Sequence, residues 1–252
     1  MLSNTVVLIL KDALPIFWSI AILIVLIPKW QHWLYFGIVS GIIVCLLVFN
    51  NIGIISQYAD GLGFEFLKIL LLIIAYLIAV AFFVNNQLRY SLLAGLLAAL
   101  FIICIIILNA SNLLLFYVSF WRLNEQTHSL FLGLILGIGI CTSIATLLVL
   151  LLKPLQKVKV ARYLFLVFVV GQFSHIAYLL QQTDLVTSQQ IWNSKQFISD
   201  ENEIGQFLAT LIGYESSPTG LYILIYLIAL ITPNLLRLFI NSMRKGKKES
   251  MK

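Results

Sequence analysis

Charged residues are scarce in this chain. Asp, Glu, Lys and Arg together make up 10% of its 252 residues, whereas 61% of the residues are hydrophobic. A soluble domain could not bury so large an apolar fraction in a single core, so the composition excludes that class of protein. The sequence therefore predicts an integral membrane protein, whose apolar side chains are in contact with membrane lipid.

Cysteine is also rare, with three residues in all, and each of them lies inside an apolar segment. Their spacing fits neither a disulfide framework nor a thiolate metal site, so Cys45, Cys104 and Cys141 are interpreted as small buried side chains. The chain likewise lacks a Ser/His/Asp set, a GxSxG elbow, a phosphate-cradling glycine loop and an HExxH motif. We therefore expect neither enzymatic activity nor a permanently bound cofactor.

Seven apolar segments are long enough to cross the hydrocarbon core of a bilayer as helices, which takes about 20 residues each. They cover residues 5–28, 33–56, 64–84, 91–121, 129–152, 160–181 and 220–240. The first segment is longer than the core of a signal peptide and no small-residue cleavage site follows it, so it is expected to remain as a span. The predicted fold class is an all-α, multi-pass membrane protein with seven transmembrane helices in one domain.

The positive charges fall mainly on one side of this predicted bundle, and their distribution sets the orientation. With the C terminus in the cytoplasm, the outer side carries only Lys68, Arg122 and Lys195. The inner side then carries Lys29, Arg89, Lys153, Lys157, Lys159, Arg162, Arg237, Arg244, Lys245, Lys247, Lys248 and Lys252. We therefore expect a cell-membrane protein with its N terminus outside, and we attribute the formal charge of +6 to topology rather than to nucleic-acid binding.

The longest connection, residues 182–219, is predicted on the outer side between the sixth and seventh spans. Its apolar residues recur at spacings that suit one or two short amphipathic helices on the membrane surface or over a cavity. These residues are Trp192, Phe197, Ile198, Ile204, Phe207 and Leu211. Ser199 is a candidate helix start, with Asp200 and Glu201 in the first turn, where the helix dipole favours acidic side chains. The loop is therefore predicted to be structured.

Two ionisable residues, Lys11 and Asp12, interrupt the first apolar segment. An ionisable side chain at the centre of a bilayer costs about 2.5–3.5 kcal/mol even on lenient insertion scales, so such residues are candidates for a functional site. Pro15, one turn later, removes a backbone hydrogen bond and can free carbonyl groups near these charges. The alternative is that both charges lie in the headgroup region, with Lys11 reaching toward water.

Further polar residues occur in pairs three positions apart, a spacing that shares one face of a helix. The pairs are Asn109 with Asn112 in the fourth span, Gln172 with His175 in the sixth span, and Glu125 with His128 in a short outer loop. Each pair could line a pathway. Hydrogen bonding between helices, or a solvated loop in the case of Glu125 and His128, is the simpler explanation. Gly133, Gly137 and Gly139 in the fifth span predict close helix packing.

One segment near the end of the chain resembles a known family. The residues that carry the resemblance are the stretch 191–199, followed by Gly205, Leu208, Gly213, Tyr214, Pro218, Tyr222 and Tyr226. They resemble the C-terminal part of the oxidase-dependent iron permeases, also called the iron/lead transporter family, whose members typically show Asp-x-Ser-x-x-Leu-Ser before a Gly, a Gly-Tyr and a Pro. Asn193 stands where the Asp usually is, whereas Ser194 and Ser199 match. Asn193 and Ser194 are therefore additional site candidates.

The resemblance implies a seven-helix fold with the N terminus outside, built as two inverted three-helix repeats and a C-terminal helix. It also implies iron transport through an Arg-Glu-Gly-x-Glu motif in the first and fourth spans, and a partner oxidase or outer iron-handling protein. In this sequence the motif falls on residues 11–15 and 108–112. Asp12 keeps one carboxylate, whereas Pro15, Asn109 and Asn112 replace the others.

These departures matter because a hard trivalent cation needs anionic oxygen ligands. We expect a divergent permease that moves a metal cation inward, with iron as the transported substrate and Asp12, Asn109 and Asn112 as its ligands. The alternative is a non-transporting membrane subunit that kept the fold after losing the carboxylates and now anchors a partner. A channel or carrier for a less charged solute is a third hypothesis, which the amides would suit.

Overall fold

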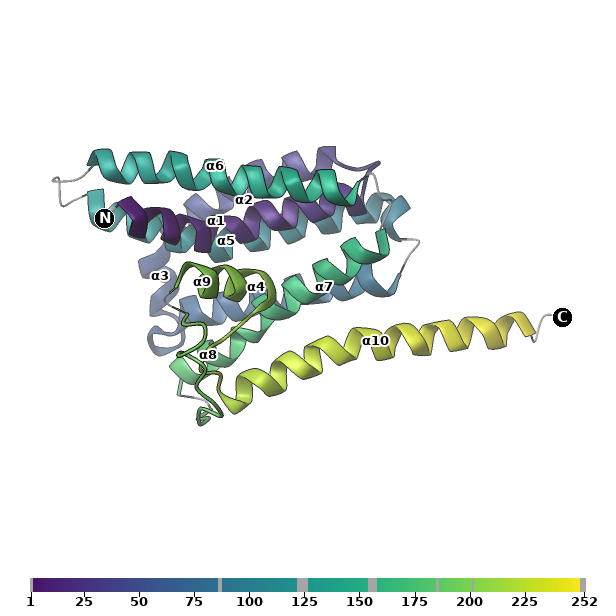
Figure 1. Ribbon diagram of the computed structural model, residues 1–252. Helices are drawn as coiled ribbons and strands as arrows, with labels where there is room; N and C mark the ends of the chain where they lie inside the picture. Colours follow the sequence, from purple (N-terminus) through teal and green to yellow (C-terminus); the bar gives the residue numbers. More distant parts are fainter. Residues whose placement is uncertain are drawn as a thin grey trace.

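The computed structural model describes residues 2–85, 88–121, 127–153, 158–184, 186–200 and 202–249. The named elements in these ranges are all helical, and seven stretches of helix are long and apolar enough to cross a membrane (Figure 1). The protein is therefore an all-α, multi-pass membrane protein, which confirms the predicted fold class. Each predicted span coincides with one of the seven stretches, with ends that differ by a few residues.

The spanning helices are α1 (Leu2–Leu26), α2 (His32–Asn50), α4 (Gly63–Val84), α5 (Leu92–Trp121), α6 (Thr127–Leu152), α7 (Val158–Ser174) with its continuation α8 (Ile176–Gln182), and α10 (Gly220–Glu249). The shorter elements are α3 (Ile52–Gln57), the 3-10 turns η1 (Ala59–Gly61) and η2 (Leu88–Tyr90), and α9 (Glu203–Ile212). A break at His175, which the sequence did not predict, separates α7 from α8 within the sixth span.

The first six spans form two halves that pack against each other in the same way. α1 runs along α6, and α2 runs along α5. The first helix of each half also contacts the third helix of the other half, because α4 packs on α5 and α7 packs on α1. α1 and α5 run in opposite directions (Figure 1). Each half therefore makes the same helix contacts to the other half, which is the arrangement expected of two inverted three-helix repeats.

Glycines at matching places bring the two halves into close contact. A side-chain carbon added to Gly37 of α2 would lie 2.9 Å from the Ala99 Cα of α5, and one added to Gly137 of α6 would lie 2.6 Å from Ile9 Cγ2 of α1. Both distances are shorter than a van der Waals contact, so these two seams have no room for a larger residue. Gly139 faces open space, so its predicted packing role is wrong, whereas that of Gly137 is confirmed.

Burial separates the spans into an inner and an outer group. α1, α5 and the α7–α8 span are half or more buried inside the protein, whereas α2, α6 and α10 are less than a quarter buried, and α4 lies between the two groups. Large apolar side chains cover the exposed faces of the outer helices, such as Tyr35 and Leu46 of α2 and Leu147 of α6. These faces suit contact with lipid. The buried polar residues Asp12 of α1 and Asn109 of α5 are instead surrounded by protein, which lowers the cost of placing them in a span.

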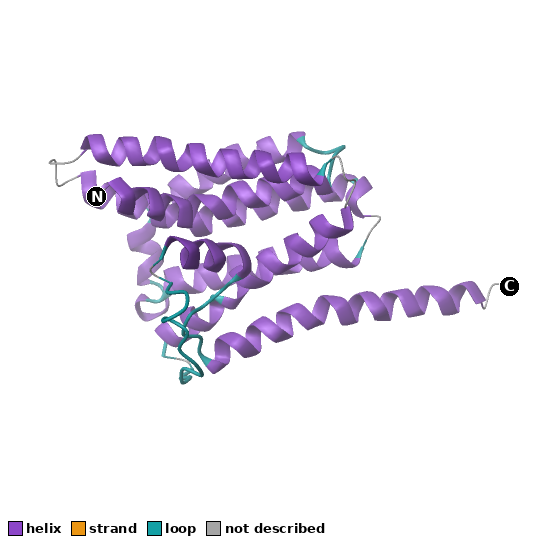
Figure 2. Cartoon of the chain, viewed as in Figure 1, coloured by secondary structure: helices purple, strands orange, loops and turns teal. Residues whose placement is uncertain are grey.

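The connection between α8 and α10 forms a structured loop at one end of the bundle, which we call the loop end (teal in Figure 2). The predicted amphipathic helix is present as α9, but it begins at Glu203, later than predicted. Asp200 stays outside the helix because its carboxylate accepts hydrogen bonds from the Ser216 N–H, at 2.9 Å, and from the Ser216 hydroxyl. α9 ends at Gly213, whose φ of 71° is the left-handed conformation that glycine adopts readily.

The seventh span, α10, packs beside α4, α7 and α8 and then continues past them (Figure 1). The Tyr76 hydroxyl of α4 donates to the Ala229 carbonyl of α10 at 3.0 Å, and the Arg237 guanidinium lies 5.4 Å from the centre of the Phe83 ring. α1 begins at the loop end, and α10 ends at the opposite end of the bundle (Figure 1). The two ends of the chain therefore lie at opposite ends of the bundle, as an odd number of spans requires.

Candidate functional site

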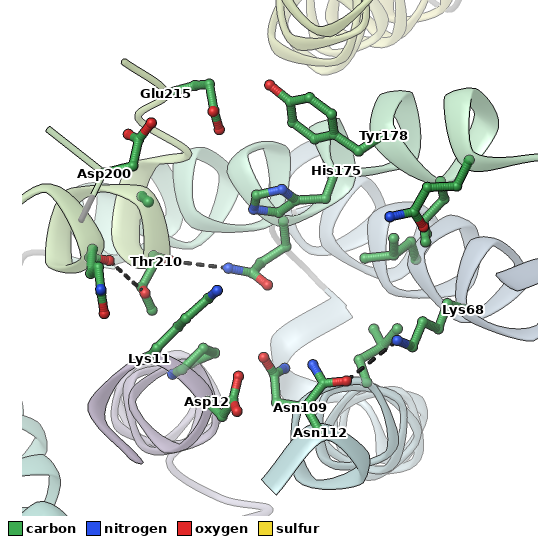
Figure 3. Close-up of a pocket in the computed structure, with 18 residues that line it drawn as sticks. Lys11, Asp12, Lys68, Asn109, Asn112, His175, Tyr178, Asp200, Thr210 and Glu215 are labelled. Carbon is green, nitrogen blue, oxygen red and sulfur yellow. Dashed lines mark hydrogen bonds between the residues drawn. The ribbon is translucent and has the colours of Figure 1, made fainter. Parts of the chain in front are cut away.

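A cavity of about 550 Å³ lies at the loop end and is partly open (Figure 3). α1, α4, α5, α7, α8 and α9 surround it, together with the loop on either side of α9. Most of its lining residues are polar, and polar residues between apolar spans are functional candidates. The polar lining residues are Lys11, Asp12, Lys68, Asn109, Asn112, Gln172, His175, Tyr178, Gln182, Asp200, Gln206, Thr210 and Glu215.

Six of the candidate site residues meet in this cavity. They are Lys11, Asp12, Asn109, Asn112, Gln172 and His175. The three predicted cation ligands come from opposite halves of the protein, with Asp12 on α1 and both asparagines on α5 (Figure 3). Asp12 and Asn109 are less than a tenth exposed, so protein rather than lipid surrounds them. The Asp12 carboxylate also interacts with the Asn112 amide.

Pro15 alters the backbone beside these charges without ending the helix, because α1 remains helical from Leu2 to Leu26. Proline carries no N–H, so the Lys11 carbonyl, four residues earlier, has no standard helical donor. Both Lys11 and Pro15 line the cavity. The freed carbonyl predicted near the charges is therefore a consequence of the proline itself and needs no interruption of α1.

The two asparagines of α5 bring neutral amide groups to the cavity. Asn109 donates from Nδ2 to the Ile105 carbonyl at 2.9 Å, which fixes the orientation of its amide. Asn112 accepts a hydrogen bond from Lys68 at its side-chain oxygen. Amide oxygens are accepted ligands of hard cations, although they carry no countercharge. The pair can therefore contribute oxygen ligands, but the negative charge must come from Asp12.

Lys68 of α4 is a cavity residue that the sequence analysis did not single out. Its Nζ donates to Asn112 Oδ1 at 3.3 Å and lies 4.5 Å from the centre of the Phe64 ring. The Asp12 carboxylate also attracts this ammonium group. The sequence did contain a signal for Lys68. It lies inside the predicted span 64–84, and an ionisable residue within a span is a candidate for a functional site, as Lys11 is.

The loop contributes two carboxylates, Asp200 and Glu215, near Tyr178 of α8 (Figure 3). Burial raises the pKa of Glu215, and the neighbouring charge of Asp200 raises it further. Gln172 Nε2 donates to the Thr210 carbonyl at 2.9 Å, which ties α9 to α7. The loop is therefore held over the cavity, and it adds negative charge to the lining.

Two of the loop candidates, Asn193 and Ser194, lie outside the cavity. Ser194 Oγ donates to the Ser216 carbonyl at 2.9 Å and lies 3.0 Å from the Tyr214 hydroxyl. Asn193 Oδ1 accepts from the Lys195 N–H at 3.0 Å, which closes a local turn. These contacts stabilise the conformation of the loop, so the segment that carries the family resemblance has a structural role in this protein.

Within the described residues, no three side chains of His, Cys, Asp or Glu come together as a metal site would need. Glu125 and the side chain of His128, a further predicted pair, lie outside that part of the chain. A cation in the cavity would therefore rely on Asp12 together with amide oxygens. The three cysteines are free and buried, as predicted, and they do not line the cavity.

The cavity combines carboxylates from α1 and the loop, ammonium groups from α1 and α4, and amides from α5, α7, α8 and α9. Such a lining can replace part of the water around a small ion. Comparisons with known protein families, with curated proteins and with solved structures gave no match to this chain. The functional interpretation therefore depends on the chemistry of the cavity and on the resemblance of the loop.

Proposed function

We propose that this protein transports a metal cation inward across the cell membrane, with iron as the substrate. The observation that carries the proposal is the meeting of Asp12 with Asn109 and Asn112 in one polar cavity between the two halves. In transporters built from inverted repeats, substrate sites lie between the repeats. The resemblance of the loop and of the motif positions to the iron permeases supports iron as the cation.

The charge of the lining favours a cation of modest charge. Three carboxylates, those of Asp12, Asp200 and Glu215, face two ammonium groups, those of Lys11 and Lys68. The lining therefore has one surplus negative charge when all five groups are ionised, and none when Glu215 is protonated. A trivalent cation would leave more positive charge unbalanced by this lining than a divalent cation would. Ferrous iron therefore suits this cavity better than ferric iron.

The proposed direction of transport follows from the orientation of the bundle. The distribution of Lys and Arg supports an orientation with the loop end outside the cell and the C terminus in the cytoplasm. The loop carboxylates then face the outside, where they raise the local concentration of cations. A reporter that is active only in the cytoplasm should give a signal when fused to Lys252. A silent cytoplasmic reporter together with an active exported one would reverse the direction.

Uptake of radiolabelled iron by cells that lack their own iron importers tests the proposal. Cells that express the protein should accumulate iron faster than cells without it. Asp12→Asn should abolish the difference, because it removes the carboxylate that lies between the halves. Asp184→Asn is the matched control, since Asp184 is an exposed loop carboxylate outside the cavity. Equal uptake with and without the protein, at normal protein levels, would contradict iron transport.

A non-transporting membrane subunit is the second candidate function, and one observation favours it. Lys68 already holds the Asn112 oxygen, so the cavity contains an internal cation where the substrate would bind. A subunit that only anchors a partner, such as an oxidase or an outer iron-handling protein, could keep this contact for stability. In that case Asp12→Asn would change the amount of folded protein or nothing at all, and iron uptake would not depend on the protein.

A further inference from the structure

Lys68 interacts with two sets of negative or acceptor groups. Its Nζ donates to Asn112 Oδ1 at 3.3 Å and is attracted by the Asp12 carboxylate. It is also attracted by Glu65, which lies three positions earlier on α4 and so on the same face of the helix. The side chain is partly buried, and its ammonium group also lies 4.5 Å from the centre of the Phe64 ring.

The Lys68 ammonium binds the same groups that would hold the substrate cation. The Asn112 oxygen can accept from an ammonium group or coordinate a metal ion, and two positive charges that share these ligands repel each other. A bound metal ion and Lys68 therefore cannot both use Asp12 and Asn112. The cavity volume of about 550 Å³ and the flexible four-carbon stem of lysine allow the ammonium to move.

We infer that Lys68 is a built-in competitor of the substrate, whose ammonium holds Asp12 and Asn112 when the cation site is empty and moves to Glu65 when a metal cation binds. The inference rests on the transport function proposed above. A cation must attract the ligands more strongly than an ammonium group does in order to displace it. Lys68 therefore selects divalent metal ions over Na⁺ and K⁺. Its return to the ligands also favours release of the metal ion.

Binding of Mn²⁺ to the purified full-length protein, measured from the electron paramagnetic resonance signal of the free ion, tests this role without relying on uptake. Lys68→Met removes the ammonium but keeps an unbranched stem, so it should tighten Mn²⁺ binding about tenfold and let Na⁺ compete. Lys68→Arg keeps the charge and should not tighten binding. Lys195→Met removes an exposed loop lysine outside the cavity and should leave binding unchanged.

Glu65→Gln provides a second variant with the opposite expected sign. Without Glu65, the Lys68 ammonium loses its alternative partner and remains on Asp12 and Asn112, so Mn²⁺ binding should weaken roughly three- to tenfold. Unchanged or weaker binding by a folded Lys68→Met protein would overturn the inference. Tighter or unchanged binding by Glu65→Gln, or no Mn²⁺ binding by any variant, would overturn it as well.

The two experiments can contradict the competitor role of Lys68 and the transport function independently of each other. If the wild-type protein takes up iron but Lys68→Met binds Mn²⁺ no more tightly, the competitor role is wrong and transport stands. If the wild-type protein takes up no iron while Lys68→Met still binds Mn²⁺ more tightly, the competitor role stands as a property of the cation site and iron transport is wrong.

Discussion

The two halves of the bundle pack alike but bring different chemistry to the cavity. The first half, made of α1, α2 and α4, contributes the charged residues Lys11, Asp12 and Lys68. The second half, made of α5, α6 and α7 with α8, contributes amides, an imidazole and a phenol. These residues are Asn109, Asn112, Gln172, His175, Tyr178 and Gln182. A symmetric packing arrangement therefore does not require a symmetric site.

The two halves can share their packing and still differ in cavity chemistry for a physical reason. A helix seam needs matching shapes on both sides, and the seams at Gly37 and Gly137 meet that need in both halves. A carboxylate needs a nearby countercharge. Carboxylates at positions 12, 109 and 112 together would repel one another whenever no cation is bound. Keeping Asp12 beside Lys11 and Lys68 avoids that repulsion, but it also weakens the attraction for a highly charged substrate.

The largest expected effect comes from breaking the shared packing. Gly37→Leu should strongly destabilise the protein, because its Cβ would meet the Ala99 backbone at 2.9 Å. Overpacking typically costs about 1–3 kcal/mol, and a contact with backbone leaves little room for relief. Thermal unfolding in detergent measures the loss. Gly139→Leu is the control, since no atom lies within 4 Å of its Cβ position. Equal stability of the two variants would show that the seam is not close-packed.

A smaller effect is expected from removing the chemical difference between the halves. Asn109→Glu combined with Asn112→Glu adds two carboxylates opposite Asp12. Iron uptake should rise roughly two- to tenfold, because hard cations prefer anionic oxygen ligands. Asn193→Glu adds a carboxylate to the loop outside the cavity and should leave uptake near the wild-type rate. Unchanged uptake by the double variant, at normal protein levels, would show that α5 does not line the pathway.

The smallest effect concerns the loop carboxylates. Because burial and Asp200 raise the pKa of Glu215, the folded protein holds this proton more tightly than the unfolded chain does. The resulting stabilisation is present below the ordinary range of a glutamate and is lost as the pH rises through the raised pKa. Glu215→Gln should flatten this pH dependence of thermal stability and stabilise the protein at neutral pH by less than about 1 kcal/mol. Asp184→Asn should keep the wild-type profile, and an unflattened Glu215→Gln profile would contradict the assignment.

Local sequence was sufficient to predict the spans, because length and apolarity define a membrane helix. The shared location of Asp12 and Asn109 was expected only through the family resemblance, whose motif falls on both positions. Lys68 could have been singled out as an ionisable residue inside a predicted span, but its contact with Asn112 could not, because Asn112 is on another helix and no spacing along α4 reveals it. The late start of α9 depends on the pairing of Asp200 with Ser216, a contact that exists only in the folded loop.

The most direct test of the account moves the carboxylate across the cavity. Asp12→Asn alone should abolish iron uptake. Combining Asp12→Asn with Asn109→Asp returns one carboxylate to the cavity from the opposite half, and a substantial part of the uptake should return. Combining it with Asn193→Asp places the carboxylate outside the cavity, where it should restore nothing. Wild-type uptake by Asp12→Asn, or no recovery by a folded Asp12→Asn/Asn109→Asp protein, would contradict a cation site shared between the two halves.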